Sequence, residues 1–323
     1  MLKKTKNLDP LNQAIKDSLQ ACKKPLILAH IRPDGDAVGS IVALGSGLRQ
    51  LEKDPILVLS DGLPKRYRFL DGCETITTSL TEPYDLVITV DCANRERLST
   101  PDELEEVHVN IDHHVTNEQY ANHNLIKPQL ASTTAILAKH MPMWGISITK
   151  KIANALMMGM ITDTIGFRTN NVTPEFLRLA GDLLEEGAQL ADMYHKGLTL
   201  HSVKASKIWG FALSRLETDQ HLAWTSILVD DRKKAEYESR DDADLTNHLS
   251  SIENIDISIL FNEQKDGKVK VSWRSSEQYD VTQIAALYGG GGHPQASGAT
   301  LTGTLDAVKQ RVIGETKKLL EGK

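Results

Sequence analysis

The stretch Pro25-Leu-Ile-Leu-Ala-His30-Ile-Arg-Pro-Asp34-Gly-Asp36 determines the fold that we expect. Its first half is a short apolar run, which predicts a buried strand, and a loop with proline and glycine follows. Beyond Asp36 the apolar residues recur at helical spacing, as Val38, Ile41, Leu44, Leu48 and Leu51. A strand that leads through a short loop into an amphipathic helix is one βα unit, so this stretch predicts an α/β fold.

The same pattern recurs along the first half of the chain. Short apolar and β-branched runs at 56–59, 86–90 and 107–111 are separated by segments that suit helices. Strands that alternate with helices are typical of a mostly parallel sheet. From about 131 to 216 the apolar spacing is helical, and strand-like runs return at 221–229, 256–261 and 269–273.

The length of 323 residues is enough for two hydrophobic cores. We expect a first domain at 1–190, a helical connector at 191–218 and a smaller α/β domain at 219–323. The sequence contains neither an internal repeat nor a low-complexity linker, which favours a helical junction between the domains.

Composition and charge narrow the class of protein. Apolar residues make up 40% and charged residues 25%, as in soluble globular proteins. No apolar run approaches the roughly 18 residues of a membrane span, and no apolar segment of a secretory signal follows the basic N-terminus. We therefore expect a cytoplasmic protein without a membrane partner. The three cysteines are too widely spaced for a disulfide framework or a zinc motif. A net charge of −6 argues against long duplex DNA as a partner and favours a small substrate in a local pocket.

Histidines and aspartates, which are common metal ligands, follow three of the predicted strands and end one predicted helix. In an open parallel sheet, ligands bind beyond the carboxyl ends of the strands. Each residue alone has an ordinary structural explanation, as a turn former, a helix cap or a buried histidine. The set comprises His30, Asp34 and Asp36 after the first strand, Asp91 after 86–90, Asp112, His113 and His114 after 107–111, and Asp163 at the end of the helix predicted from 148.

The number of these residues favours a metal centre over separate structural roles. Crowding carboxylates and imidazoles at one sheet edge costs free energy unless cations neutralise them. Mixed imidazole and carboxylate ligands suit a divalent first-row ion, and six such residues are enough for two ions that share a bridging carboxylate. Two neighbouring ions can hold a phosphoryl group and activate a water. The alternative is an inert structural cluster.

The ordered set of motifs resembles the DHH phosphoesterase family. The N-terminal motifs are His30-x-x-x-Asp34-x-Asp36, Asp91-x-x-Asn94, Asp112-His113-His114 and Thr162-Asp163-Thr164. The segment Gly289-Gly-Gly-Gly-His293-Pro-Gln-Ala-Ser-Gly-Ala299, preceded by Val271-Ser-Trp-Arg274-Ser-Ser276, resembles the DHH-associated C-terminal domain. The resemblance covers nearly the whole chain. It implies a metal-dependent phosphoesterase with its active site in the cleft between two domains.

The resemblance also implies a role for each residue of the set. One ion would be bound by His30, Asp34 and Asp91, and the other by Asp36, Asp91, His113 and Asp163. His114 would face the substrate phosphate as an electrostatic stabiliser or a proton donor, and Asp112 would orient an imidazole. Manganese is the family's usual ion, and the sequence leaves magnesium and cobalt open.

The second domain contains the predicted substrate-binding residues. Glycine lets the backbone approach a ligand closely, so that N–H groups can line a phosphate, although a flexible turn is the simpler reading of a glycine run. Arginine offers a planar fork that suits a terminal phosphate. The candidates are Arg274, Ser275, Gly290, Gly291, Gly292 and His293.

Arg168 is a further candidate, in the segment Thr164-Ile165-Gly166-Phe167-Arg168. In many relatives a glycine follows the Thr-Asp-Thr motif directly, whereas isoleucine does so here. The length is unchanged, so the resemblance still implies that Asp163 is a ligand. Arg168 either lies near the phosphate or forms a structural ion pair.

The resemblance narrows the substrate class. We see no room for the extra domains of RecJ-type exonucleases, no C-terminal motif of family II pyrophosphatases, and no transmembrane segments as in the membrane-bound cyclic-dinucleotide phosphodiesterases. The stand-alone bacterial group remains. Its members degrade oligoribonucleotides of a few residues (nanoRNA), cleave the linear dinucleotide pApA or dephosphorylate adenosine 3′,5′-bisphosphate (pAp). The sequence does not rank these substrates. A RecJ-like single-strand exonuclease and a catalytically silent nucleotide-binding regulator are the alternatives, and a homodimer stays open.

Overall fold

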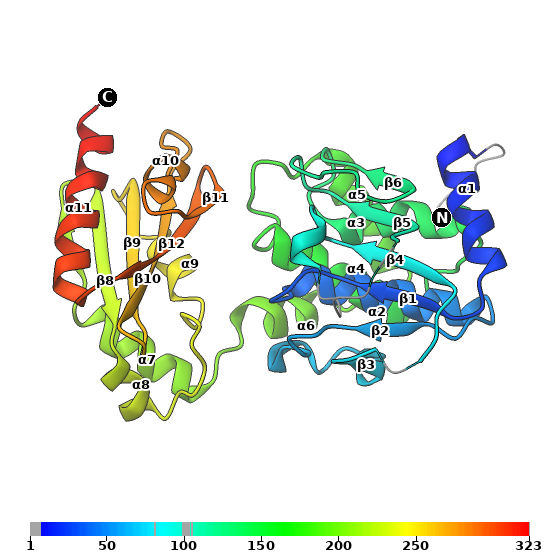
Figure 1. Ribbon diagram of the computed structural model, residues 1–323, viewed down its shortest axis with the longest axis horizontal. Coiled ribbons are helices and arrows are strands. Elements are labelled where there is room, and N and C mark those ends of the chain that lie inside the picture. Colours follow the sequence, from blue (N-terminus) through cyan, green and yellow to red (C-terminus); the bar gives the residue numbers. More distant parts are fainter. Residues whose placement is uncertain (1–7, 81, 99–103, 105, 323) are drawn as a thin grey trace. The chain divides into compact units, whose positions relative to one another are not determined.

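The computed structural model describes residues 8–80, 82–98, 104 and 106–322, and the basic segment 1–7 lies outside this range. The chain divides after Leu200 into two compact units, which we call unit 1 and unit 2 (Figure 1). Each unit contains one six-stranded sheet. In the described part of the chain, no helix is both long enough and apolar enough to cross a membrane.

Unit 1 is built on a parallel sheet, as the sequence predicts. All neighbouring strands run parallel, and the first strand of the chain lies in the middle of the sheet. The short strands β3 and β6 are the two that sequence patterning did not predict. The order is β3 (Ile76–Thr77), β2 (Ile56–Val58), β1 (Pro25–Leu28), β4 (Leu86–Val90), β5 (Val109–Asp112) and β6 (His123–Ile126).

Helices of unit 1 bury the larger hydrophobic core against one face of this sheet. Ile27 and Ile88 point to that face and belong to the same cluster as apolar residues of α2, α3 and α4. Leu26 and Val87 belong to a smaller cluster on the other face, because successive side chains of a strand alternate. The helices are α1 (Pro10–Ala21), α2 (Gly35–Gln50), α3 (Thr133–His140), α4 (Lys150–Asp163), α5 (Pro174–Glu185) and α6 (Leu190–Tyr194). Shorter turns of helix are η1 (Lys65–Tyr67), η2 (Cys73–Thr75), η3 (Arg95–Arg97), η4 (Met141–Trp144) and the π-helical turn η5 (His195–Thr199).

Unit 2 has a mixed sheet. Only β8 and β9 pair in parallel, and all other neighbours are antiparallel. The order is β11 (Gly291–His293), β12 (Ala296–Thr302), β10 (Lys268–Ser275), β9 (Ile257–Glu263), β8 (Leu222–Ile227) and β7 (Glu217–Asp219). The helices are α7 (Val203–Leu213), α8 (Val229–Ala235), α9 (Leu245–Leu249), α10 (Thr282–Ala286) and α11 (Leu305–Glu321).

The two faces of the unit 2 sheet have different partners. Trp273 on β10 is fully buried in a cluster that includes Val308 and Val312 of α11. Arg274, the next residue, points to the opposite face because strand side chains alternate. On that face Leu260 packs with apolar residues of α7 and α9.

Candidate metal centre

The three strands that lead into the candidate ligands are neighbours in the unit 1 sheet. The order β1, β4, β5 places His30, Asp91 and the Asp112–His114 segment beyond adjacent carboxyl ends. Asp91 leaves its strand with a left-handed backbone conformation (φ 54°), which aspartate adopts more readily than most residues. Adjacent parallel strands therefore bring together residues that lie far apart in the sequence.

Two helices contribute the other candidates. Asp34 caps α2, where its Oδ1 accepts hydrogen bonds from the backbone N–H of Asp36 (3.0 Å) and Ala37 (3.1 Å). Asp163 is the last residue of α4. The helices α2 and α4 pack so closely that a Cβ at Gly159 would lie 2.4 Å from Asp36 Oδ1. Glycine at 159 thus allows the two helices to carry Asp36 and Asp163 to one place.

The donor atoms of these residues form three groups, each within 4.8 Å. His30 Nε2 lies 3.5 Å from Asp91 Oδ2 and 3.9 Å from Asp34 Oδ2. His113 Nε2 lies 3.6 Å from Asp91 Oδ1 and 3.3 Å from Asp163 Oδ2. The groups are His30 with Asp34 and Asp91; Asp36 with His113 and Asp163; and Asp91 with Asp112, His113 and His114.

The chemistry of this donor set fits divalent cations. Two ligands on adjacent corners around an ion at about 2.1 Å are roughly 3 Å apart, close to the shorter separations seen here. Within the described ranges, no lysine or arginine forms an ion pair with Asp36, Asp91 or Asp163. Burial, followed by the charge of Asp91, raises the pKa of Asp36 well above its usual value. Burial and the charge of Asp36 do the same to the pKa of Asp163. Among the described residues, no lysine or arginine therefore supplies positive charge to these three carboxylates.

Histidines compensate part of this negative charge. Burial alone would lower the pKa of His30, but hydrogen bonds to Asp34 and Asp91 outweigh it and raise the pKa to about 10. At neutral pH and without metal, His30 is therefore a cation that stands between two carboxylates. A metal ion bound there would displace this proton, because an imidazole binds metal in its neutral form.

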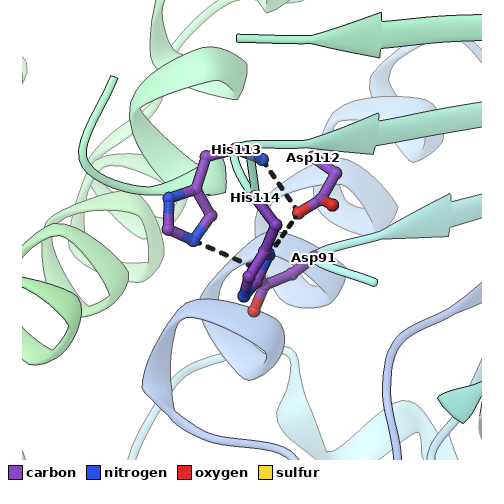
Figure 2. A group of neighbouring side chains, drawn as sticks. All are labelled: Asp91, Asp112, His113 and His114. Atoms are coloured by element: carbon purple, nitrogen blue, oxygen red, sulfur yellow. Dashed lines mark hydrogen bonds and ion pairs between the residues drawn. The ribbon is translucent and has the colours of Figure 1, made fainter. Parts of the chain in front are cut away.

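Asp112 and His114 form a separate pair beside the carboxylates. Asp112 Oδ1 lies 2.7 Å from His114 Nδ1 and accepts a hydrogen bond from the backbone N–H of His113 (Figure 2). This contact fixes a proton of His114 on Nδ1 and orients the imidazole ring. Burial lowers the pKa of His114, but the bond to Asp112 and the charge of Asp91 outweigh it and raise the pKa to about 9.

Asp112 is itself held by residues that sequence reasoning missed. Asn117 donates from Nδ2 to Asp112 Oδ2 (2.6 Å) and to Asn110 Oδ1 (2.8 Å), and Asn110 donates to Thr89 Oγ1 (2.9 Å). The network joins β4, β5 and the loop after His114. A polar side chain shortly after the histidine pair was the available signal, but asparagine in a loop is too common to be singled out.

Arg274 in unit 2 is a partly buried cation. Its Nη1 donates to the carbonyl of Trp273 (3.0 Å). Removal from water lowers the pKa of the guanidinium, and the charge of Asp242 opposes this effect. Among the described residues no carboxylate forms an ion pair with Arg274. The hydroxyl of the next residue, Ser275, donates to the carbonyl of Tyr279 (2.7 Å) and so closes a turn.

The glycine run owes part of its composition to packing. A Cβ at Gly290 would lie 2.2 Å from the carbonyl oxygen of Gly298, and one at Gly292 would lie 2.4 Å from that of Ala296. Both glycines are therefore required by the close approach of β11 to β12. Gly291 and His293 are exposed. The run is thus a tightly packed strand edge, and its exposed atoms are the ones that a ligand could reach.

Arg168 lies in the turn that follows Asp163. Its side chain is exposed and forms no ion pair with the described residues, so the structural ion pair considered above is absent there. Ile165 and Phe167 in the same turn have left-handed backbones (φ 49° and 65°). Such a conformation is unfavourable for isoleucine in particular.

The fold and the site together define a two-domain protein of the DHH type. The family model described as "DHH family, N-terminal domain" matches residues 24–160, and that of the DHHA1 domain matches residues 224–319. The chain belongs to the DHH family.

Particular relatives resemble almost the whole chain. The bifunctional oligoribonuclease and PAP phosphatase NrnA of Thermus thermophilus is 31% identical, over 95% of this chain and 93% of the relative. The protein of the same name from Mycoplasma pneumoniae is 30% identical, over 93% and 94%. The crystal structure of an exopolyphosphatase-related protein from Bacteroides fragilis superimposes with a TM-score of 0.88 at 25% identity, over 98% of this chain and 99% of the other.

Proposed function

We propose that this protein is a divalent-metal-dependent phosphoesterase that hydrolyses short oligoribonucleotides and adenosine 3′,5′-bisphosphate. The observation that carries the proposal is the group of carboxylates and imidazoles at adjacent strand ends, where among the described residues no lysine or arginine pairs with Asp36, Asp91 or Asp163. A site of this composition suits metal-assisted hydrolysis of phosphate esters. The names of the Thermus and Mycoplasma relatives support the choice of substrate.

The proposal includes two cations, with manganese as the preferred ion. One would be held by His30, Asp34 and Asp91, and the other by Asp36, Asp91, His113 and Asp163. Asp91 is the only one of these residues whose two oxygens face different histidines, Oδ2 facing His30 and Oδ1 facing His113, which supports a bridging role. When bound, such ions polarise the phosphoryl oxygens and lower the pKa of water. Mixed nitrogen and oxygen donors suit Mn²⁺ better than Mg²⁺, which favours oxygen donors.

His114 is the proposed proton donor. Its Nδ1 faces Asp112, which fixes the ring, and the bond to Asp112 helps to raise its pKa to about 9 in the metal-free protein. The ring can therefore donate the Nε2 proton to the leaving oxygen of the ester, or keep it and offset negative charge on the phosphate. Asn117 supports this role through Asp112.

Unit 2 contains the proposed binding groups for a terminal phosphate. Arg274 forms no ion pair with a carboxylate among the described residues, and its guanidinium could take a terminal phosphate in a bidentate contact. His293 and the exposed backbone at Gly291 extend the same surface, while Ser275, Gly290 and Gly292 shape it. Arg168 is a second proposed phosphate contact, since its guanidinium is exposed and close in sequence to Asp163. A cytoplasmic location is part of the proposal.

A substrate panel tests the proposal. The protein with Mn²⁺ is incubated with pApA, pAp, RNAs of three to five nucleotides, long single-stranded DNA and pyrophosphate, and the products are separated by chromatography. The proposal predicts mononucleotides from the short RNAs and AMP from pAp, with little cleavage of long DNA. Processive digestion of the long strand would favour the RecJ-like alternative. Binding of pApA without any product would favour the silent regulator.

A further inference from the structure

The N-terminus of α3 is hydrogen-bonded to two candidate metal ligands from other elements. The backbone N–H of Thr133 donates to Asp36 Oδ2 (2.6 Å), and that of Thr134 donates to Asp36 Oδ1 (2.9 Å). The hydroxyl of Thr134 also donates to Asp36 Oδ1 (2.6 Å). The hydroxyl of Thr133 donates to Asp91 Oδ1 (3.0 Å). Four hydrogen bonds thus connect two adjacent threonines with two carboxylates.

These hydrogen bonds are not needed to cap α3. Ser132 is the N-cap, and its hydroxyl accepts a hydrogen bond from the backbone N–H of Ala135 (3.1 Å). The N–H groups of the first two helical residues have no partner within a helix. Here they donate to a carboxylate that lies 97 and 98 positions earlier in the chain. The N-terminus of α3 is therefore capped by Ser132 and, in addition, donates two backbone hydrogen bonds to Asp36.

The surroundings leave Asp36 little freedom to turn. Asp36, Thr133 and Thr134 are all fully buried. On another side, Gly159 approaches so closely that a Cβ there would lie 2.4 Å from Asp36 Oδ1. Since Oδ1 already accepts two hydrogen bonds and Oδ2 accepts one, Oδ2 is the oxygen with an unused lone pair. Asp36 is held in one orientation with one oxygen available.

We propose that Thr133 and Thr134 are positioning residues of the metal centre, which fix Asp36 and Asp91 in their binding orientation before an ion arrives. This inference rests on the proposed function, because it assumes that these carboxylates bind cations. Partners that orient a ligand typically change metal affinity by about 10–100-fold when they are lost. Both threonines are fully buried and hydrogen-bonded to the proposed ligands, so they would act through Asp36 and Asp91.

The two threonines differ in what their hydroxyls reach. The Thr134 hydroxyl donates to Asp36, which belongs to one donor group, and it also lies 3.0 Å from the hydroxyl of Ser132. The Thr133 hydroxyl contacts Asp91, which belongs to two donor groups. Loss of the hydroxyl at 134 should weaken one ion, whereas loss at 133 should weaken both. The backbone hydrogen bonds to Asp36 survive in either variant.

The experiment measures binding of Mn²⁺ alone to the metal-free full-length protein, by equilibrium dialysis with electron paramagnetic resonance of the free ion. Thr133→Val and Thr134→Val remove one hydroxyl each and keep the branched shape. Thr133→Ser and Thr134→Ser keep the hydroxyl. The control is Thr225→Val, because Thr225 is a buried threonine of unit 2 whose hydroxyl donates only to the carbonyl of Ala212. Thermal unfolding of each metal-free variant is recorded in parallel.

The proposal predicts that Thr134→Val weakens one binding step about 10–100-fold, that Thr133→Val weakens both, and that serine restores them. Thr225→Val should lower stability without changing affinity. Unchanged Mn²⁺ binding in the valine variants would overturn the positioning role, even if their stability fell. Should a valine variant fail to fold, the pair Thr134→Ser and Thr134→Ala decides the question, since they differ only in the hydroxyl. If the unaltered protein bound no Mn²⁺, the proposed function itself would fail.

Discussion

The carboxyl edge of the unit 1 sheet and the surface around Arg274 in unit 2 treat charge in opposite ways. At the edge, buried carboxylates gather with no lysine or arginine paired to Asp36, Asp91 or Asp163 among the described residues. Around Arg274, a partly buried guanidinium forms no ion pair within the same described part of the chain, and only the more distant charge of Asp242 opposes the effect of its burial. A buried charge without a counter-charge costs free energy. Each region is therefore suited to a ligand of the missing sign, cations in unit 1 and an anion in unit 2.

The two regions also differ in how they reach unusual backbone conformations. The edge of unit 1 holds the non-glycine residues Asp91, Ile165 and Phe167 in left-handed conformations, with Gly166 (φ 73°) between the last two. The run in unit 2 uses Gly289 and Gly292 at its positive φ values of 68° and 146°. Non-glycine residues in this region carry strain that tends to occur at functional sites. The difference indicates that the edge of unit 1 carries backbone strain where it positions side chains, whereas the run in unit 2 offers backbone atoms to a ligand.

The largest expected effect comes from Asp91, which lies in two donor groups. Asp91→Ala should lower the turnover of pApA by more than about 1000-fold, because both ions lose a ligand. His114→Ala should lower the turnover of pApA by roughly 100-fold, the usual contribution of one proton donor. This variant should still bind metal. Turnover is measured together with bound metal by elemental analysis, and circular dichroism checks the fold. Two retained ions in Asp91→Ala would rule out the bridging role.

Arg274→Ala probes the other side of the comparison. A charge-assisted hydrogen bond contributes about 1.5–3 kcal/mol, so kcat/KM for a 5′-phosphorylated dinucleotide should fall roughly 10–100-fold. Most of the loss should appear in KM, because Arg274 would bind the substrate end equally strongly in the ground state and in the transition state. Cleavage of bis-p-nitrophenyl phosphate, which lacks a terminal phosphate, should hardly change. Equal losses on both substrates would show that Arg274 supports the fold or the metal centre.

Within unit 1, His140 can be compared with His30, because its hydrogen-bond partner is an amide rather than a carboxylate. His140 is buried, its Nδ1 lies 2.8 Å from Asn12 Oδ1, and its Nε2 has no hydrogen-bond partner among the described residues. Burial lowers its pKa from 6.5 to about 4, whereas carboxylates raise the pKa of His30. Between pH 6.5 and about pH 4, His140 binds a proton in the unfolded chain but not in the folded chain, so the free energy of unfolding decreases as the pH falls. From pH 7 to 5 the loss at this group should be about 2 kcal/mol.

The matched variant for this pH effect is His140→Gln, which keeps a polar side chain but does not titrate. Urea unfolding at pH 7 and pH 5 gives the free energy of unfolding of each protein. The difference between the two pH values should be smaller in the variant by about 2 kcal/mol. Identical pH dependence in both proteins would show that His140 is protonated in the folded state as well.

The smallest expected effect tests the strain at the edge. Ile165→Gly should raise the free energy of unfolding by about 0.5–1 kcal/mol, because relief of the left-handed conformation exceeds the entropy cost of glycine. The control is Gly181→Ala on α5, where a Cβ would meet nothing within 4 Å and where the helix should gain about 0.5–1 kcal/mol from alanine. A clear loss of stability in Ile165→Gly would mean that the isoleucine side chain contributes more than its backbone costs.

The sequence predicted the parts of the fold that depend on local pattern. The strand at Pro25–Leu28, the helix that Asp34 caps and the helix that ends at Asp163 are all present, because apolar spacing and cap residues determine them directly. The short strands β3, β6, β7 and β11 were missed, since runs of two to four residues carry little periodicity. Their existence depends on neighbouring strands that offer hydrogen-bond partners.

The candidate site shows the same limit. The motif spacing pointed to the six proposed ligands, and the structure brings their donor atoms together. Thr133 and Thr134 were read only as part of a helical segment, because nothing local indicates that their N–H groups would meet a carboxylate nearly a hundred residues away. The glycine run was read as a ligand loop, whereas Gly290 and Gly292 are also required by contacts with β12. Long-range packing of this kind is not encoded in any one stretch.

The central claim is that the carboxyl edge of unit 1 is a metal-dependent centre for hydrolysis of short nucleotides. The most direct test is removal of metal from the full-length protein by chelation, verified by elemental analysis, followed by the rate of AMP release from pApA. We predict that the metal-free protein loses activity by more than about 100-fold and that Mn²⁺ restores it more fully than Mg²⁺. Undiminished release of AMP by the verified metal-free protein would contradict the account.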